Sequence, residues 1–394
     1  MHLFKNIKKT AAVVLSAVLV GLFGTAGYYS QRLPDRVTAE TADVSFALYP
    51  ELRSELYSED CAAVSLFGAI PVKNISLRQE ETPILIAGGK PFGIKLLMEG
   101  VMVTGMGDVD CSEGKVCPAE VAGVKKGDVI RLAAGQPVSS NADLQRIISE
   151  SCGEPVELSI RRSGEEREVS LVPVYSRSAG AWKGGMWVRD SIAGIGTMTF
   201  IDKATGTFAG LGHPVCDNDT GEMIPIHSGE AVPVDITRVR SGETGIPGEL
   251  HGQFKRSPVY GTLIRNTPSG VYGVLTNNSE ERLGGEEFPM GYRQEATVGE
   301  AYILSTVAGG TPKKYAAEIE KIDYSDTESA KNMVIRITDP ELIAVSGGIV
   351  QGMSGSPIIQ NGKLIGAVTH VFVADPTRGY AVFAETMYEN MRNS

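Results

Sequence analysis

The chain has 394 residues and a net charge of −10, with 42% hydrophobic and 21% charged residues. Its length allows two or three domains of ordinary size, and its composition excludes a disordered chain. The acidic balance, without a basic cluster beyond the N-terminus, argues against nucleic-acid binding. The 46 glycines and the scarcity of helical periodicity predict many short strands, and therefore a mainly β protein.

An uncharged apolar run at residues 11–29 follows Lys5, Lys8 and Lys9. It is just long enough to cross a bilayer as a helix, and the basic flank favours a cytoplasmic N-terminus. We therefore expect residues 1–30 to be a cytoplasmic tail and a transmembrane anchor, with the rest of the chain outside the cytoplasm. A signal peptide cleaved near Ala26 is the alternative.

Residues 31–90 show little helical periodicity and contain two short strand-like runs, at 63–66 and 84–86. This mixed stretch is interpreted as a membrane-proximal stem.

Residues 91–175 are the clearest unit of the chain. They contain the run A-G-V-K-K-G-D-V-I at 122–130, and then Leu144, Ile147 and Ile148 at the spacing of one helix face. This order of segments resembles a PDZ domain. The resemblance implies that a peptide binds as an added strand, at the positions that match the family's binding loop and strand. These positions are Phe92, Gly93, Ile94 and Leu96.

Residues 187–394 are mostly strand-like runs separated by Gly, Pro, Asn and Asp clusters, and a linker at 176–188 runs into the first of these strands. About 200 residues of this kind suit a double β-barrel better than one small sandwich. Residues 313–321 are ambiguous between helix and strand, and the last ten residues favour a helix.

The most informative motif is Gly352-Met353-Ser354-Gly355-Ser356-Pro357, followed by an apolar strand. Glycines on both sides of Ser354 allow a tight turn whose amides can face a developing oxyanion, so a serine nucleophile is predicted here. The amides of Gly352 and Ser354 are the expected donors. An ordinary Gly/Ser turn and a nucleophilic Ser356 are the alternatives.

A serine nucleophile needs a base within hydrogen-bond reach. His213 stands in G-L-G-H-P at 210–214, at the end of a strand, and is the preferred candidate. His370, on the strand after the serine turn, is the best rival. Cys216 lies three residues after His213, but no second ligand pair stands at a recognisable spacing, so a packing role is preferred to a metal site.

The carboxylate that would orient the base is harder to choose. Asp339 is attractive because the motif Thr338-Asp339-Pro340 ends an apolar strand and would hold the carboxylate at a fixed point. An Asp-Pro turn that only ends the strand is the alternative. The other aspartates that composition leaves open are Asp217, Asp219, Asp235, Asp323, Asp326 and Asp375.

Taken together, the apolar anchor, the PDZ unit, G-H-P at 212–214, I-T-D-P at 337–340 and the long final motif at 351–373 resemble the stage IV sporulation protein B signalling peptidases. The resemblance implies a C-terminal chymotrypsin-like double β-barrel serine peptidase domain. It places the catalytic triad on His213, Asp339 and Ser354, and it implies no metal or organic cofactor.

The same resemblance implies partners and a location. The expected substrates are a membrane regulatory complex whose cleavage triggers pro-sigma-K processing, and the chain itself in trans. The expected location is the space between the forespore and mother-cell membranes. An inactive PDZ-containing scaffold is the competing hypothesis. A quality-control peptidase is a further one, but its PDZ domain normally follows the peptidase, whereas here the PDZ motif precedes it.

Overall fold

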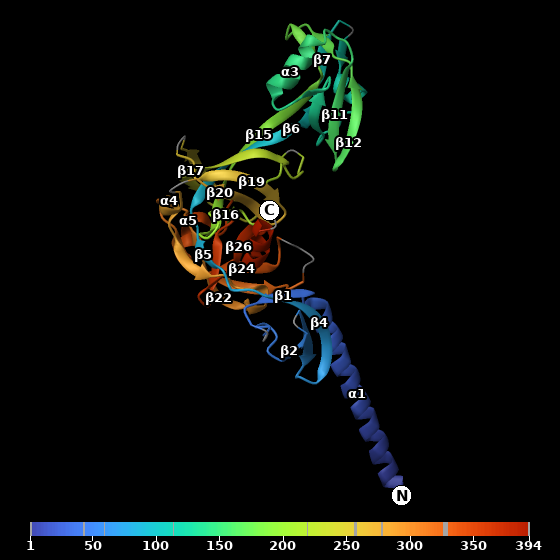
Figure 1. The fold of residues 1–394 in the computed structure, drawn as a ribbon, viewed down its shortest axis with the longest axis vertical. Helices are drawn as coiled ribbons and strands as arrows, with labels where there is room; N and C mark the ends of the chain where they lie inside the picture. Colours follow the sequence, from blue (N-terminus) through green and yellow to red (C-terminus); the bar gives the residue numbers. More distant parts are fainter. Residues whose placement is uncertain are drawn as a thin grey trace.

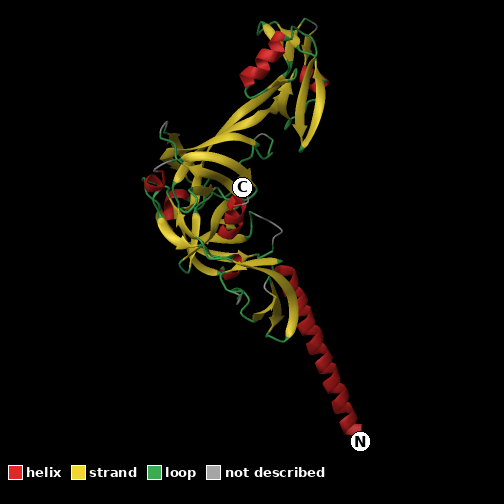
Figure 2. Cartoon of the chain, viewed as in Figure 1, coloured by secondary structure: helices red, strands yellow, loops and turns green. Residues whose placement is uncertain are grey.

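The structure, a computed structural model, describes residues 2–41, 44–58, 60–112, 114–218, 220–255, 258–276, 279–325 and 330–392. Most of the described chain forms strands (Figure 2), which confirms the predicted mainly β fold. The molecule is elongated, with helix α1 (His2–Arg32) at one end and the unit around helix α3 (Asn141–Glu150) at the other (Figure 1).

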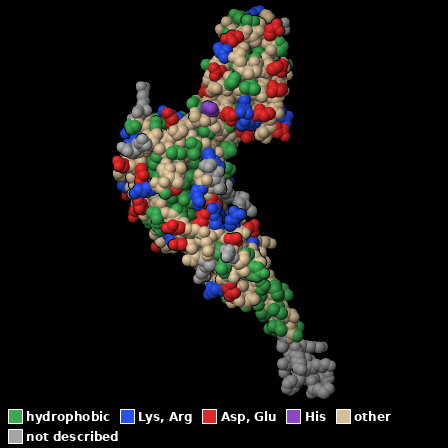
Figure 3. All heavy atoms as spheres, viewed as in Figure 1, with side chains coloured by type: hydrophobic (Ala, Val, Ile, Leu, Met, Phe, Trp, Pro, Cys, Tyr) green, Lys and Arg blue, Asp and Glu red, His purple; other side chains and the backbone are tan. Residues whose placement is uncertain are grey.

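Helix α1 includes a segment, Ala12–Arg32, that is long and apolar enough to cross a membrane. Its apolar side chains gather on the described surface of the helix (Figure 3), and Val13, Val20 and Phe23 are exposed. So long an exposed apolar surface is unfavourable in water, which indicates a membrane anchor or a signal sequence.

The stem is a small sheet with the strand order β1-β4-β3-β2. Its strands are β1 (Arg36–Ala39), β2 (Leu52–Ser58), β3 (Cys61–Leu66) and β4 (Ile70–Gln79). Its apolar face shares one core with the C-terminal part of the chain, because Phe46 and Val64 cluster with Ile303 and Tyr324. The stem is therefore docked on the globular part.

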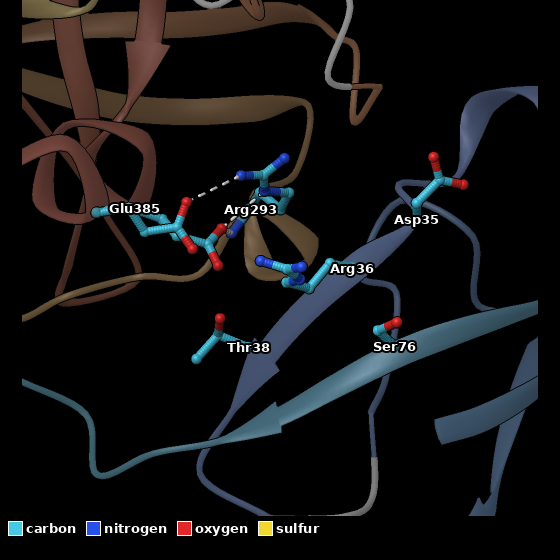
Figure 4. Close-up of a pocket in the computed structure, with 7 residues that line it drawn as sticks. Asp35, Arg36, Thr38, Ser76, Arg293 and Glu385 are labelled. Carbon is cyan, nitrogen blue, oxygen red and sulfur yellow. Dashed lines mark hydrogen bonds and ion pairs between the residues drawn. The ribbon is translucent and has the colours of Figure 1, made fainter. Parts of the chain in front are cut away.

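A polar pocket of about 300 Å³ marks this junction (Figure 4). Arg36 of the stem lines it together with Arg293 of the short helix η1 (Arg293–Glu295) and Glu385 of helix α6 (Ala384–Arg392). Arg293 Nε lies 2.8 Å from Glu385 Oε2, and both side chains are buried. This ion pair joins α6, the helix expected at the C-terminus, to the short helix η1.

The N-terminal barrel is a closed ring of six strands in the order β6-β17-β19-β20-β16-β15, because β15 pairs back onto β6. The strands are β6 (Pro91–Met106), β15 (Met186–Asp202), β16 (Thr207–Gly210), β17 (Ile226–Arg240), β19 (Gly261–Thr267) and β20 (Gly270–Leu275). Strands β5 (Ile84–Ala87), β21 (Glu286–Pro289) and β18 (Glu249–Phe254) extend this sheet, and helix α4 (Ser279–Leu283) follows β20.

The C-terminal barrel is closed in the order β22-β23-β24-β27-β26-β25. Its strands are β22 (Gly299–Ser305), β23 (Lys313–Ile322), β24 (Met333–Ile337), β25 (Pro357–Gln360), β26 (Lys363–Phe372) and β27 (Asp375–Phe383), with helix α5 (Pro340–Ser346) after β24. Residues 313–321 are thus strand. The two barrels share a core in which Phe200 and Tyr272 contact the cluster around Ile359 and Val382.

Strands β6 and β15 correct the predicted domain boundaries. The first part of β6 pairs with the last part of β15 in the barrel, for example Ile94 with Gly194. The last part of β6 pairs with the first part of β15 beyond the barrel, for example Val103 with Val188. Strand β6 therefore begins in the N-terminal barrel and continues into the PDZ-like unit, and β15 leads the chain from that unit back into the barrel (Figure 1). The PDZ-like unit is an insertion between the first two barrel strands rather than a separate domain at 91–175.

The inserted unit has its own core, in which Leu144, Ile147 and Ile148 of α3 are buried as predicted. The buried carboxylate of Asp128, in the G-D-V-I run, forms an ion pair with Arg162, whose Nε lies 2.7 Å from Asp128 Oδ1. This ion pair holds the turn before β9. Its elements are β7 (Val109–Cys111), β8 (Gly114–Val116), α2 (Pro118–Val121), β9 (Val129–Ala133), β10 (Gln136–Pro137), α3, β11 (Val156–Arg162), β12 (Glu165–Leu171), β13 (Val174–Ser176) and β14 (Ala181–Lys183).

Candidate active site

The Ser354 turn lies where the two barrels meet, and strand β15 of the N-terminal barrel supports it. Thr197 donates through its backbone N–H to Ser354 O at 2.8 Å. Its hydroxyl donates to Gly352 O at 2.8 Å, and the Thr199 hydroxyl donates to Gly355 O at 2.8 Å. Three hydrogen bonds from one strand therefore hold the turn.

Glycine is required at position 355. Its φ of +97° lies in the left-handed region, and a Cβ there would lie 1.9 Å from Thr197 O. A larger residue would push the turn away from β15, so Gly355 allows the close approach that the three hydrogen bonds need.

The amides around Ser354 divide into paired and unpaired groups. Met353 N–H donates to Val350 O at 3.0 Å, and Gly355 N–H donates to Val368 O at 2.7 Å. Within the described residues, the N–H groups of Gly352 and Ser354 donate to no protein acceptor. Two nearby amides without a protein acceptor in a largely buried turn are free to donate to a bound group, which is the arrangement that an oxyanion site requires.

The Ser354 side chain is partly buried, and its hydroxyl donates to Thr369 O of β26 at 2.7 Å. This rotamer keeps the hydroxyl on the C-terminal barrel and not on a histidine. The rival Ser356 is fully buried and bonds Ser305 Oγ at 3.1 Å. Ser354 is therefore the only one of the two that lies at the surface of the site.

His213 follows β16 through Leu211 and Gly212, both with positive φ. A Cβ on Gly212 would lie 2.9 Å from Thr369 Cγ2, so this turn packs directly against β26. The His213 ring lies 4.7 Å, centroid to centroid, from the ring of His370. The structure thus brings His213, His370 and the Ser354 turn to one place between the barrels.

The protonation of His213 follows from its partner. Nδ1 lies 2.8 Å from Pro214 O, and a carbonyl can only accept, so Nδ1 carries the proton and Nε2 keeps its lone pair. Burial lowers the pKa of His213 below its usual range, and the Pro214 hydrogen bond partly opposes this. The ring is therefore neutral at neutral pH, in the tautomer that a general base requires.

His370 is a weaker candidate for the base. Desolvation, and then the neighbouring charges of His213 and Lys331, lower the pKa of His370 to about 4. Within the described residues no hydrogen bond to its ring is found, whereas the ring of His213 is held in place.

In the structure Asp339 does not hydrogen bond to His213. The Asp339 carboxylate accepts the N–H groups of Glu341 and Leu342 at 2.9 and 3.1 Å, and so caps helix α5. Its other oxygen accepts Ala316 N–H at 3.2 Å. The Asp-Pro motif therefore ends one strand and begins a helix, as aspartate at an N-cap before proline commonly does.

Among the other described aspartates, none hydrogen bonds to His213, whose ring contacts only Pro214 O in this way. Asp217 pairs with Arg189, Asp235 with Lys255, and Asp375 caps its own turn at Thr377. Asp323 binds the Ser325 N–H. Asp219 and Asp326 lie outside the described residues.

The predicted peptide-binding residues lie inside the N-terminal barrel. Phe92, Gly93, Ile94 and Leu96 belong to the part of β6 that pairs with β17 on one edge and with β15 on the other. A Cβ on Gly93 would lie 2.6 Å from Val232 Cγ2. With both edges occupied, this segment cannot accept a peptide strand, and the prediction for these four residues is wrong.

Sequence reasoning missed Thr197 and Thr199, which support the serine turn from more than 150 positions away in the chain. The only local signal is their spacing of two, which places both side chains on one face of a strand. Within the described ranges, no group of three or more His, Cys, Asp and Glu side chains is arranged to hold a metal ion.

Two closed six-stranded barrels, a serine turn with two unpaired amides and a strand-end histidine between them define a chymotrypsin-like serine peptidase. The family model described as SpoIVB peptidase S55 matches residues 180–388, just over half of the chain. The chain belongs to this family. A PDZ domain model also matches, at residues 113–172.

The solved structures that resemble parts of this chain have low sequence identity to it. Rv3671c from M. tuberculosis H37Rv, in an inactive mutant form, is 12% identical over 51% of this chain and 83% of its own, with a TM-score of 0.29. The HtrA-type protease AlgW with a decapeptide is 13% identical over 53% of each chain, with a TM-score of 0.30.

The PDZ domain of the SdrC-like protein from Listeria monocytogenes is 18% identical over 23% of this chain and 90% of its own, with a TM-score of 0.19. A search of curated proteins gives no significant match. Because these TM-scores are low, the double-barrel fold rests on the strand pairing described above.

Proposed function

We propose that the protein is a signalling serine endopeptidase in which Ser354 is the nucleophile and His213 is the general base. The observation that carries this proposal is the pair of unpaired amides at Gly352 and Ser354, in a turn whose serine hydroxyl and the loop of His213 both contact Thr369. The reaction class is acyl transfer from a peptide bond to serine and then to water.

In the first step, Ser354 Oγ forms a bond to the scissile carbonyl carbon while its proton moves to His213 Nε2. The carbonyl oxygen becomes an oxyanion between the amides of Gly352 and Ser354. Collapse breaks the C–N bond, and the leaving amine takes the proton from His213. Water then attacks the acyl-enzyme by the same route, and Ser354 regains its proton.

The first step requires a change of the Ser354 rotamer. The hydroxyl rests on Thr369 O and must turn toward His213 Nε2 when substrate binds. Catalytic hydrogen bonds are often formed only in the substrate complex. We therefore propose that the structure represents a resting state of an active enzyme.

For its biological role, we propose a regulatory cut in sporulation, which membership of the SpoIVB peptidase family supports. The helix Ala12–Arg32 supports an extracytoplasmic peptidase attached to, or exported across, a membrane. The proposed substrates are a membrane regulatory complex that controls pro-sigma-K processing and, in trans, the N-terminal part of the chain itself. The PDZ domain is proposed to bind a peptide of such a partner.

The test uses the full chain solubilised in detergent and a fluorescent fluorophosphonate, which reacts with activated serines. Wild type and Ser356→Ala should be labelled at one site, whereas Ser354→Ala and His213→Ala should not. Mixing wild type with full-length Ser354→Ala should shorten the inactive chain from its N-terminus, which gel shift and N-terminal sequencing detect. A wild type that neither labels nor trims would leave only the inactive scaffold.

A further inference from the structure

The segment after His213 is held as a loop, here named the histidine loop and defined as the described residues 214–218 and 220–224. It begins at Pro214, whose carbonyl accepts His213 Nδ1–H at 2.8 Å. Its two ends are joined, because Ile224 N–H donates to Val215 O at 3.1 Å. The position of the Pro214 carbonyl therefore depends on what fixes the base of this loop.

Asn266, on barrel strand β19, fixes that base with its whole amide. Its Oδ1 accepts Val215 N–H at 2.8 Å, and its Nδ2 donates to Val215 O at 2.7 Å. The same Nδ2 also donates to Ile224 O at 3.0 Å. These three hydrogen bonds join both ends of the loop to strand β19, and they hold Val215, the residue after Pro214.

We propose that Asn266 is a positioning residue for catalysis: it holds the histidine loop so that the Pro214 carbonyl selects the tautomer and orientation of His213. This inference rests on the proposed role of His213 as the base. The relay runs from Asn266 to the Val215 backbone, to Pro214 O, and to His213 Nδ1.

The chemistry of the relay agrees with the rest of the site. A triad carboxylate keeps the histidine in the tautomer with Nδ1 protonated, and its replacement by an amide lowers turnover about 10⁴-fold because the tautomer becomes wrong. The Pro214 carbonyl has no proton to donate, so it selects the same tautomer without a charge.

The experiment compares Asn266→Ala and Asn266→Asp with wild type in the full chain. Asn266→Asp is isosteric and keeps the acceptor for Val215 N–H, but it sets an oxygen against the carbonyls of Val215 and Ile224. Thr262→Ala is the matched control, because Thr262 is an exposed residue of the same strand. The readouts are the rate and pH dependence of fluorophosphonate labelling, the unfolding temperature, and the tautomer of His213 by ¹⁵N NMR of the imidazole.

Both Asn266 variants should label about 10–10⁴-fold more slowly, because the ring is no longer held in one tautomer. The saturating constant for the reagent should stay unchanged, and the NMR signal of His213 should show mixed tautomers. Loss of the Pro214 hydrogen bond should also move the acidic limb of the rate profile to lower pH, since that bond favours the protonated ring. Thr262→Ala should behave as wild type.

The outcomes separate this inference from the proposed function. A wild type that does not label at Ser354 refutes the proposed function. A wild type that labels, beside a folded Asn266→Asp with the same rate and a single His213 tautomer, refutes the role of Asn266 alone. A slower variant whose His213 tautomer and pH profile are unchanged also refutes it, because Asn266 would then act only on stability.

Discussion

Thr197 offers the sharpest test of how the two barrels cooperate. The change Thr197→Val keeps the shape and the β-branched character of the side chain but removes the hydroxyl that donates to Gly352 O. The carbonyl of Gly352 is then left in a buried turn without a donor. The hydrogen bond from the Thr197 N–H to Ser354 O does not depend on the side chain, so the change tests the hydroxyl's hydrogen bond alone.

The magnitude follows from burial. An unsatisfied buried carbonyl costs about 1–3 kcal/mol. Every 1.4 kcal/mol corresponds to about a tenfold change in an equilibrium, so the correctly placed turn should become about 5–140 times less favoured against a displaced one. Because the displaced turn misplaces the amides of Gly352 and Ser354, the labelling rate should fall by up to this factor.

The assay is fluorophosphonate labelling combined with thermal unfolding, with exposed Thr262→Val as the control. The unfolding temperature of Thr197→Val should fall by about 2–4 °C for each kcal/mol lost. Unchanged labelling in a destabilised variant would show that the hydroxyl supports stability and not the oxyanion site. Unchanged stability and rate would refute the hydrogen bond itself.

Three further predictions follow from the site. Asp339→Asn keeps a good helix cap, so labelling should stay within about twofold of wild type and stability should hardly change; a loss near 10⁴-fold would make Asp339 the missing acid. Gly355→Ala should abolish labelling and lower the unfolding temperature, since the Cβ would lie 1.9 Å from Thr197 O at a φ of +97°; a stable, labelled variant would show that the turn can move. The pKa of His370 is lowered to about 4 from its usual value of 6.5, so the unfolded chain binds the proton more tightly and the folded state loses stability as pH falls from 6.5 to 4. In His370→Asn the fall in unfolding temperature from neutral pH to about pH 4 should therefore be smaller than in wild type. An equal fall would contradict the lowered pKa.

Local patterns gave the parts of the site that depend on local structure. The Gly-rich turn around Ser354 and the strand-end position of His213 follow from residues that are neighbours in sequence, and the structure keeps both. The role of Asp339 could not be chosen from the sequence, because an Asp-Pro motif at a strand end fits a helix cap as well as a catalytic acid. In the structure its carboxylate accepts the N–H groups of Glu341 and Leu342.

The rest of the fold depends on partners that lie far away in the chain. Residues 92–96 alternate like any half-buried strand, and nothing in them tells whether the neighbouring strand belongs to a PDZ domain or to a barrel. Their partners are 192–196 and 229–233. Asn266 could not be found for the same reason, since the loop it holds lies more than 40 positions earlier.

The long pair β6 and β15 also has a consequence for how the chain folds. Leu97 pairs with Ser191 in the barrel, so the first two barrel strands are separated by the whole inserted domain. Closing so long a loop carries an entropy that grows by about 0.6 kcal/mol with each doubling of its length. If the insert folds first, it brings its own two ends together and shortens that loop to a hairpin. The PDZ domain thereby becomes a folding template for the barrel, and a variant with a destabilised insert should assemble its active site slowly even when the finished enzyme is normal.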